Sequence, residues 1–378
     1  MRAWKATSSN PERFMARAAK LARLGRGATA PNPCVGAVLV NDDEIVAEGW
    51  HMRHGGLHAE RECLADARAK GVDPRGMTMF VTLEPCNHHG KTPPCTEAVV
   101  ESGVAKVVVG TRDPNPVAAG GVEFLEKNGV QVEVGVLEGE CRDLIADFLL
   151  WQNSKLPFSI VKMAATLDGK IASRRRVPEA VSSPESFAQV HRLRAMAGAV
   201  VVGGGTFRAD DPSLTCRMDD LADDFVQPLA VVVTSQLPTG PKLAKLLCDR
   251  PHQVVFLTTE SAAVSEEAKV VRELGAEVWP LPGEPGRLDL RPGFERLRTE
   301  KGCHYTLIEG GGQFAMQCVE QGLAHEIVHF VAPRILGDEA APSAYAGRGD
   351  VGMAEALDWR IVDAVPSGGD VMLTLRPE

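Results

Sequence analysis

Apolar side chains recur at helical and strand spacing in turn along the first part of the chain. Helical spacing occurs in four segments, residues 11–24, 58–70, 96–102 and 121–129. A glycine follows or closes each of these segments, as is common at helix ends. Short apolar runs predict five strands, at residues 35–40, 45–50, 77–83, 104–110 and 130–136. This alternation predicts a three-layer α/β/α domain.

A second α/β unit is predicted to follow. A helix over residues 140–153 leads out of the first unit. Apolar runs then predict seven further strands, at residues 158–164, 199–202, 229–234, 253–258, 303–308, 326–331 and 371–375. Residues 260–300 are polar and punctuated by proline and glycine, and they give no clear pattern. We therefore expect two domains, residues 1–153 and 154–378.

Composition narrows the class of protein. A chain of 378 residues is long enough for two cores, and 44% hydrophobic with 24% charged residues is typical of a globular protein. The net charge of −9 argues against a nucleic-acid partner, because binding phosphates requires surplus Lys and Arg. No apolar run approaches the roughly 18 residues of a membrane span, and no secretory signal is recognisable. Nine scattered cysteines favour free thiols in the cytoplasm and a metal site over a disulfide framework.

One constellation predicts a catalytic metal centre. His58 and Glu60 open a predicted helix, while Cys86 follows a strand and Cys95 starts another helix. His-x-Glu followed by Pro-Cys and a second Cys is the signature of the zinc nucleobase deaminases. His58, Cys86 and Cys95 would supply three ligands and leave a fourth position for water. Zinc lowers the pKa of that water from about 16 to about 7, and Glu60 would carry the proton to the departing nitrogen.

A structural zinc site, or cysteines without metal, is the alternative reading. A structural site needs a fourth ligand, and His88 and His89 lie close enough in the sequence to be considered. Eight residues separate the two cysteines, where the common deaminase signature has two. This longer loop could reach over the pocket. Lys91 within it would suit an anionic group, or would be an ordinary solvated lysine.

Two sets of short motifs stand out along the chain. In the first half they are NPCVG at 32–36, HAE at 58–60, TLEPCNHHGKTPPC at 82–95 and RDPNP at 112–116. In the second half they are KMAATLDGK at 162–170, ADDPSLT at 209–215, EGG at 309–311 and APRILG at 332–337. Together these motifs resemble the bifunctional deaminase/reductase family of riboflavin biosynthesis. The resemblance covers nearly the whole chain, in the order found in the family.

The resemblance implies a cytidine-deaminase-like domain followed by a dihydrofolate-reductase-like α/β domain. The first would deaminate 2,5-diamino-6-(5-phosphoribosylamino)pyrimidin-4(3H)-one with one zinc ion. The second would then reduce the ribosyl chain with NADPH, giving 5-amino-6-(5-phosphoribitylamino)uracil. The family also implies a small-molecule ribotide substrate and a homo-oligomer.

Site residues carry over from the family by motif. The deaminase substrate would contact Asn32, His51, Lys91, Asp113 and Asn115. The cofactor would contact Ala164, Thr206, Asp210, Ser235, Gly311, Gly312, Gln313, Phe314, Ala315, Met316 and Gln317. The reductase substrate would contact Lys162, Arg194, Leu214, Arg217 and Glu309. Arginines suit its 5′-phosphate, and a glycine-rich turn before a helix suits the cofactor pyrophosphate.

One stretch departs from the family pattern. Ala180 stands where the family has an aromatic residue, and Arg174, Arg175 and Arg176 precede it. The arginines could hold a 2′-phosphate, or could form a solvated turn. A deaminase whose second domain binds a ligand without turnover is therefore the alternative function. A cytidine, deoxycytidylate or nucleic-acid deaminase is a further alternative, which the acidic charge, the long cysteine spacing and the large second domain disfavour. A non-enzymatic zinc scaffold is the last alternative, and it predicts that Glu60→Gln keeps zinc and changes nothing else.

Overall fold

The computed structural model describes residues 10–88, 93–175, 179–238 and 244–378. The chain divides into two compact units, Met1–Ser154 and Lys155–Glu378. Among the helices in the described ranges, none combines the length and the apolar character needed to cross a membrane.

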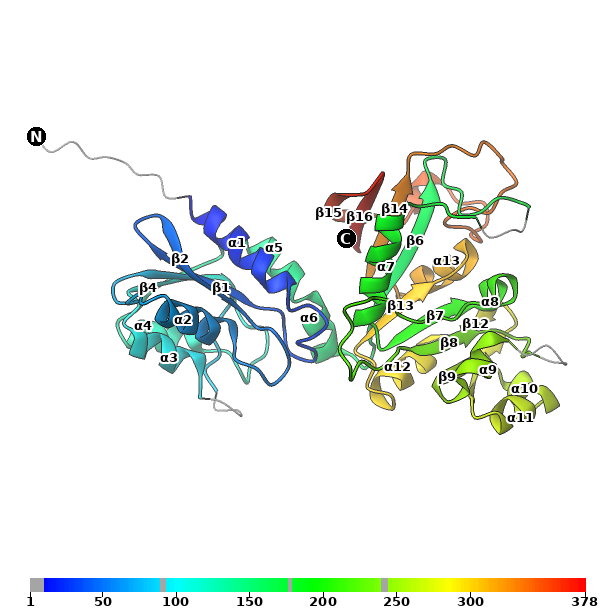
Figure 1. Ribbon diagram of the computed structural model, residues 1–378, viewed down its shortest axis with the longest axis horizontal. Coiled ribbons are helices and arrows are strands. Elements are labelled where there is room, and N and C mark those ends of the chain that lie inside the picture. Colours follow the sequence, from blue (N-terminus) through cyan, green and yellow to red (C-terminus); the bar gives the residue numbers. More distant parts are fainter. Residues whose placement is uncertain (1–9, 89–92, 176–178, 239–243) are drawn as a thin grey trace, which may run out of the picture. The chain divides into compact units, whose positions relative to one another are not determined.

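The first unit is built on a five-stranded sheet (Figure 1). Its strands, in spatial order, are β2 (Glu44–Trp50), β1 (Gly36–Asn41), β3 (Thr78–Leu83), β4 (Lys106–Thr111) and β5 (Gln131–Val134). β1 pairs antiparallel with β2 and β3, whereas β3, β4 and β5 run parallel. The carboxyl ends of β3 and β4 therefore meet at one edge, which is where open α/β sheets place ligands.

Helices cover both faces of this sheet (Figure 1). α1 (Pro11–Arg23) and α5 (Glu138–Leu144) pack on one face, where Phe14 and Met15 contact buried side chains of β1, β3 and β4. The other face carries α2 (Ala59–Ala69), α3 (Cys95–Ser102) and α4 (Gly121–Lys127). Each fully buried Leu, Val or Met contributes about 1.5–3 kcal/mol through removal from water. The three-layer α/β/α expectation is confirmed.

The helix expected over residues 140–153 is wrong in one respect, because it is two helices. α5 ends at Leu144 and α6 (Ala146–Asn153) begins after Ile145. Ile145 has φ −108° and ψ 16°, outside the helical region, and its side chain is 2% exposed. The buried Asp147 carboxylate accepts a hydrogen bond from the Phe148 N–H at 2.7 Å. The break thus lets Ile145 enter the core and provides an acceptor at the start of α6.

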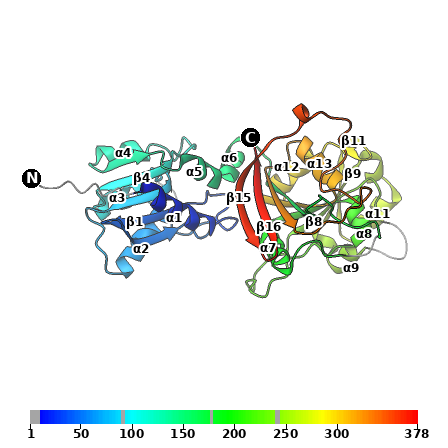
Figure 2. The ribbon, with the colours of Figure 1, turned by 90° about the horizontal axis from the view of Figure 1, so that it is seen from above.

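The second unit contains a nine-stranded sheet (Figure 2). Its strands, in spatial order, are β10 (Glu277–Leu281), β9 (Val254–Thr259), β8 (Leu229–Val233), β7 (Ala199–Gly203), β13 (Tyr305–Glu309), β6 (Phe158–Thr166), β14 (Glu326–Ala332), β16 (Asp370–Pro377) and β15 (Trp359–Ser367). The strands from β10 to β14 in this order pair parallel, and the β16–β15 hairpin joins antiparallel. The seven strands expected here are all present.

The strand order reverses direction at the centre of this sheet. From β6 the chain moves out through β7, β8, β9 and β10, then returns to place β13 between β7 and β6. The main helices of the unit are α7 (Pro184–Met196), α8 (Gly204–Asp210), α9 (Lys245–Asp249), α10 (Glu260–Ala263), α11 (Glu266–Glu273), α12 (Arg291–Thr299) and α13 (Gly312–Glu320). The carboxyl ends of β7, β13 and β6 lie together at this switch point, the usual ligand position of such sheets.

Residues 260–300, which gave no clear pattern, fold into α10, α11, β10, α12 and a small hairpin of β11 (Gly283–Glu284) and β12 (Arg287–Leu288). The outermost strands, β10 and β15, were not expected from the sequence. Each contains a proline, Pro280 in β10 and Pro366 in β15. Edge strands tolerate proline because one side of their backbone makes no ladder hydrogen bonds.

Candidate functional site

Three strand and helix ends bring the predicted metal ligands together in the first unit. His58 is the residue before α2, Cys95 is the first residue of α3, and Cys86 follows β3. The sulfur atoms of Cys86 and Cys95 lie 3.5 Å and 3.4 Å from His58 Nδ1. Their ligand atoms all lie within 4.8 Å of one another, so one ion could contact all three. One imidazole and two thiols are a donor set that zinc prefers.

The electrostatics of this cluster favour a cation. The hydrogen bond with the Cys95 thiol, despite burial, lowers the pKa of Cys86, and His58 adds to the effect. The pair of cysteines therefore carries a thiolate near neutral pH, and thiolate is the form that binds metal. The Cys95 N–H also donates to Cys86 Sγ at 3.4 Å.

Glu60 lies in the first turn of α2 with 3% of its surface exposed. Burial raises its pKa to about 7, and the charge of nearby Cys86 acts in the same direction. A carboxyl group with a pKa near neutrality can both accept and release a proton, which suits a general acid and base. Glu60 is not among the metal-ligating atoms of the cluster.

The fourth ligand of a structural site is not found in the described part of the chain. The metal-ligating cluster contains His58, Cys86 and Cys95, and His88 is not part of it. His88 Nδ1 is buried without a hydrogen-bond partner. His89 and Lys91 lie outside the described residues. An open fourth position distinguishes a catalytic zinc site from a structural one.

His51 lies beside the metal ligand His58, and Asn32 lies next to His51. The His51 ring packs edge-on against the His58 ring, with centroids 5.3 Å apart. His51 Nδ1 lies 2.8 Å from Leu57 O, and Asn32 Nδ2 lies 3.3 Å from His51 Nε2. Burial lowers the pKa of His51, so the ring is neutral, donates from Nδ1 and accepts from Asn32 at Nε2.

Asp113 and Asn115 belong to a loop, residues 112–120, that runs from β4 to α4. The Asn115 N–H donates to Asp113 Oδ1 at 2.8 Å. Burial raises the pKa of Asp113, and the charge of Cys86 contributes to this shift, which places the carboxylate within electrostatic reach of the metal ligands. Two residues that tie this loop to Cys86, Glu84 and Asn87, were not among the expected site residues.

Cys34 belongs to the same sequence motif as Asn32, but its thiol is buried and protonated. Its side chain is 2% exposed, and Sγ lies 3.5 Å from Thr29 Oγ1. Burial raises the pKa of Cys34 to about 12. A buried, protonated thiol is neither a nucleophile nor a metal ligand at neutral pH.

In the second unit, three charged residues meet at the switch point of the sheet. Arg194 of α7 binds Glu309 at the end of β13 with both arms, at 2.7 Å and 2.9 Å. Lys162 of β6 places Nζ 3.9 Å from the same carboxylate. The side chains are 12–19% exposed. Although burial alone would raise it, the charges of Lys162 and Arg194 keep the pKa of Glu309 below its usual value.

The two glycine-rich turns lie at the same edge of the sheet. The Gly311 N–H donates to Thr206 Oγ1 at 3.2 Å, which joins the turn before α13 to α8. Phe314 packs against the positions where Gly203 and Gly310 would carry a Cβ. No described atom lies within 4 Å of the Cβ positions of Gly205 and Gly311, so the backbone is open to a ligand there. Such a helix start suits an anionic group.

The remaining residues that were expected to contact the cofactor differ in how far they are exposed. Ala164 shares the half-buried face of β6 with Lys162, and Ser235 is half-buried after β8, whereas Asp210 and Gln313 are exposed. Ala315 is fully buried, Met316 lines a separate apolar cavity of about 450 Å³, and Gln317 donates to Leu288 O. Ala315 therefore has no exposed atom to offer a cofactor, Met316 faces the apolar cavity, and the Gln317 amide already has a partner. Gly312 is also buried, because Ser343 O lies 2.1 Å from its Cβ position.

Leu214 and Arg217 lie on one segment. Arg250, which was not among the expected site residues, binds the backbone of this segment. Leu214 is 2% exposed and has φ +51°, a left-handed conformation that costs a non-glycine residue about 1 kcal/mol or more. Arg250 Nη2 donates to Ser213 O at 3.0 Å and Leu214 O at 3.1 Å. The Arg217 side chain is exposed, while its N–H donates to His191 Nδ1. No sequence motif marks Arg250.

The stretch that departs from the family pattern forms surface contacts. Arg174 pairs with Asp338 at 2.7 Å, and its side chain is 64% exposed. Ala180 O accepts a hydrogen bond from Arg334 at 2.9 Å. Arg176 lies outside the described residues. For Arg174 these contacts agree with the reading of a solvated turn.

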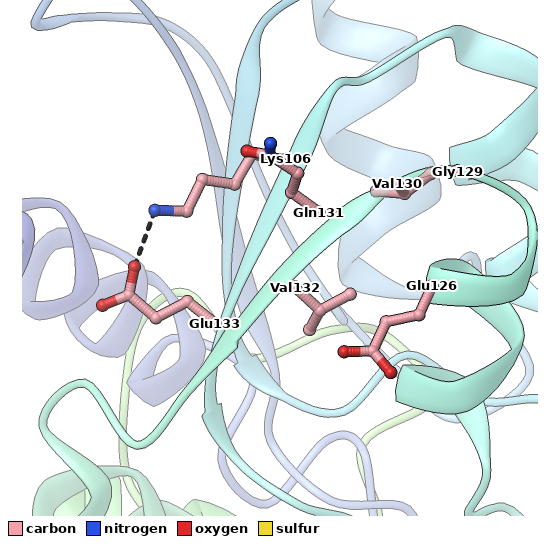
Figure 3. Close-up of a pocket in the computed structure, with 7 residues that line it drawn as sticks. All are labelled: Lys106, Glu126, Gly129, Val130, Gln131, Val132 and Glu133. Atoms are coloured by element: carbon pink, nitrogen blue, oxygen red, sulfur yellow. Dashed lines mark hydrogen bonds and ion pairs between the residues drawn. The ribbon is translucent and has the colours of Figure 1, made fainter.

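Figure 3 shows a hollow in the first unit whose lining includes none of the metal ligands. Lys106, Glu126, Val130 and Glu133 are among the residues that line it, and Lys106 pairs with Glu133. It lies at the amino ends of β4 and β5, opposite the carboxyl edge where parallel strands present ligand sites.

Comparison with known proteins assigns a class to each unit. The family of the cytidine and deoxycytidylate deaminase zinc-binding region matches residues 8–111. The RibD C-terminal domain family, which has the dihydrofolate-reductase-like fold, matches residues 157–373. Fold and site thus define a zinc-binding deaminase domain joined to a reductase domain.

Relatives match both domains in one chain. The riboflavin biosynthesis protein RibD of Bacillus amyloliquefaciens is 35% identical over 97% of this chain and 96% of its own, and that of Escherichia coli is 36% identical over 87% and 89%. A diaminohydroxyphosphoribosylaminopyrimidine deaminase/5-amino-6-(5-phosphoribosylamino)uracil reductase from Thermotoga maritima superimposes with a TM-score of 0.74 at 35% identity, covering 97% of this chain and 98% of that one. The chain belongs to the RibD family and is a bifunctional deaminase and reductase of riboflavin biosynthesis.

Proposed function

We propose that the two units perform consecutive reactions on one pyrimidine ribotide. The first unit hydrolyses the 2-amino group of 2,5-diamino-6-(5-phosphoribosylamino)pyrimidin-4(3H)-one and releases ammonia. The second unit reduces the ribosyl group of the product to ribityl with NADPH. The observation that carries this proposal is the cluster of His58, Cys86 and Cys95 beside the buried Glu60.

His58, Cys86 and Cys95 would hold the zinc ion of the deaminase unit. Zinc, when bound, supplies a water molecule of lowered pKa. Glu60 accepts the proton of the attacking water and then delivers it to the exocyclic nitrogen, which leaves as ammonia while the ring carbon gains oxygen. Its pKa of about 7 suits both directions of transfer, and its burial excludes competing protons from bulk water.

Neutral and acidic groups around the cluster would orient the pyrimidine. Asn32 and His51 form a hydrogen-bonded pair next to His58, so they can fix polar atoms of the ring. Asp113 and Asn115, on the loop after β4, can meet the amino groups or the ribose hydroxyls. Lys91 is proposed to bind the phosphate.

In the reductase unit, Lys162, Arg194 and Glu309 would bind the phosphoribosyl substrate. Arg194 is fixed by Glu309 and by Thr215 O at 2.9 Å, so its guanidinium is preorganised. Thr206 and the open glycine turn before α13 would bind NADPH through its phosphates, with Phe314 supporting that turn. NADPH supplies a hydride, while the described residues hold the substrate in place. Ala164, Asp210 and Ser235 are proposed to line the same cofactor site.

A coupled assay tests both reactions in the full chain. The protein receives zinc, NADPH and the diaminopyrimidine ribotide, and ammonia and NADPH are followed separately. Glu60→Gln is expected to lose ammonia release by at least 100-fold. The variant should retain zinc and should still oxidise NADPH when it receives the deaminated intermediate.

Three outcomes contradict parts of this assignment. Normal ammonia release by Glu60→Gln would remove its role in proton transfer. Ammonia release without NADPH oxidation by wild-type protein would favour a second unit that binds a ligand without turnover. Release of ammonia from cytidine at a comparable rate would contradict the substrate assignment.

A further inference from the structure

Two polar residues flank the zinc ligand Cys86, and both reach the loop after β4. Glu84 lies two residues before Cys86 and Asn87 one residue after it. Glu84 is 3% exposed, so its carboxylate is buried. It has no lysine or arginine partner among the described residues, and backbone N–H groups satisfy it instead.

The Glu84 carboxylate accepts three backbone hydrogen bonds. Oε2 accepts from the Asp113 N–H at 3.0 Å, whereas Oε1 accepts from Gly120 at 3.1 Å and Val122 at 3.0 Å. These donors stand at both ends of the segment 113–122, which includes Asp113 and Asn115. The Glu84 N–H also donates to Thr111 O at 2.9 Å. One side chain therefore closes both ends of the loop.

Asn87 fixes the same loop from the other side of Cys86. Its N–H donates to Ala118 O at 3.1 Å, and Nδ2 lies 3.4 Å from Gly120 O. Asn87 Oδ1 accepts from Thr96 Oγ1 at 3.0 Å, and Thr96 directly follows the ligand Cys95. The two cysteine segments and the loop thus share one hydrogen-bond network.

Packing leaves this arrangement little freedom. Pro85 O lies only 2.0 Å from the position of a Cβ at Gly121. A side chain there would push the start of α4 away from the segment of residues 84–87. The backbone of residues 120–122 therefore lies in direct contact with the backbone that leads to Cys86.

We propose that Glu84 is a positioning residue for deamination, which holds Asp113 at a fixed place relative to the zinc ligand Cys86. The inference rests on the proposed role of Asp113 in substrate binding. A carboxylate is required because all three partners are donors. A glutamine amide offers one acceptor oxygen, so its NH₂ group must face at least one N–H group.

The geometry indicates which end of the loop a glutamine releases. A glutamine oxygen placed toward Gly120 and Val122 keeps two of the three bonds. Its NH₂ then faces the Asp113 N–H, and two donors repel each other. Glu84→Gln should therefore move Asp113 while leaving α4 in place.

The test compares Glu84→Gln, Asp113→Ala and the double variant in the full-length protein with zinc. Glu84→Gln is expected to raise the KM for the diaminopyrimidine ribotide and to lower kcat/KM about tenfold or more. Zinc content should remain at one ion per chain, and NADPH oxidation with the deaminated intermediate should be unchanged. In the Asp113→Ala background, Glu84→Gln should cost less than twofold, because its effect acts through Asp113.

A matched control is Glu48→Gln. Glu48 lies on β2 of the same sheet and accepts two hydrogen bonds from Arg17 at 2.7 Å, but it has no contact with residues 113–122. This variant should leave the deaminase KM unchanged. Hydrogen exchange of the Asp113 amide provides a second measurement and should be faster in Glu84→Gln than in Glu48→Gln.

Each result has one meaning. Loss of zinc from Glu84→Gln, unchanged deamination kinetics, or additive effects in the double variant would overturn the positioning role. If Asp113→Ala alone leaves deamination intact, the proposed substrate role of Asp113 fails instead.

Discussion

Neutralising Glu309 should separate the function of the reductase site from its stability. In Glu309→Gln the carboxylate that faces Arg194 and Lys162 becomes an uncharged amide. Arg194 keeps its bond to Thr215 O but loses the charged, two-armed partner that fixes its guanidinium. The Arg194 side chain is 13% exposed, so the variant leaves the positive charge of Arg194 largely buried and without its carboxylate partner.

The magnitude follows from the distances. At 3.9 Å and an effective dielectric constant of about 20, the attraction between Lys162 and Glu309 is about 4 kcal/mol. Desolvation opposes this attraction, yet removing one partner of a buried pair still costs about 3–5 kcal/mol. We expect Glu309→Gln to lower the free energy of unfolding by about 3 kcal/mol, at the low end of this range, because the three side chains retain some exposure. For a unit of this size the melting temperature should fall by about 6–12 °C.

A second buried ion pair in the same unit provides the control. Glu326 binds Arg376 at 2.9 Å and 3.2 Å, and the Glu326 side chain is 1% exposed. Glu326 is the first residue of β14, at the opposite end of the sheet from the glycine-rich turns. Glu326→Gln should therefore cost a similar free energy of unfolding without changing substrate binding.

The assay measures thermal unfolding and reductase kinetics for both variants. Peptide-level hydrogen exchange assigns each transition to its unit, because a two-unit chain need not unfold in one step. Glu309→Gln should raise the KM for the phosphoribosyl substrate at least tenfold, whereas Glu326→Gln should not, at a temperature where both are folded. Equal KM changes in the two variants would refute the reasoning, and so would an unchanged stability of Glu309→Gln.

Three further predictions concern the metal, a glycine and a buried histidine. Removal of zinc by a chelator should abolish ammonia release but leave NADPH oxidation with the deaminated intermediate, and readdition of zinc should restore the first activity. Gly312→Ala should lower reductase activity with deamination intact, because its Cβ would lie 2.1 Å from Ser343 O; normal NADPH kinetics would contradict this. Burial lowers the pKa of His325 to about 4, so below about pH 6.5 the unfolded chain binds a proton that the folded chain does not. The contribution of His325 to the free energy of unfolding should thus be fully present above pH 6.5. It should fall by up to about 3 kcal/mol as the pH is lowered toward 4. The free energy of unfolding, measured with urea, should differ less between pH 7 and pH 5 in His325→Gln than in the wild-type protein. An equally large difference in the variant would contradict the role of His325.

The sequence predicted the central strands well because their burial is nearly complete. β7 and β9 are buried along their whole length, so their residues are continuously apolar and easily recognised. The outer strands β10 and β15 are partly exposed and mix charged residues and proline with apolar ones. Their place in the sheet depends on neighbours far away in the sequence, which a local pattern does not encode.

The metal cluster was predictable for a different reason. Its ligands are rare residue types in a spaced motif, and the structure brings His58, Cys86 and Cys95 together. Glu84 has no such signature, because the sequence does not distinguish a buried glutamate from an exposed one. Its function lies in bonds to N–H groups 29 to 38 residues away. Arg250 likewise gains its partners only through folding, since Ser213 is 37 residues away.

The prolines at the two sheet margins bear on what happens before the fold is complete. The nine-stranded sheet has mostly parallel pairing, which depends on contacts between distant parts of the sequence. Such sheets generally fold slowly, and their outer strands are exposed to other chains meanwhile. Pro280 and Pro366 remove one N–H from each outer strand and interrupt the row of donors that a foreign strand would need. The same residues that obscured these strands in the sequence thus take away a backbone donor at each margin, which is how natural sheets limit pairing with the edge of another chain.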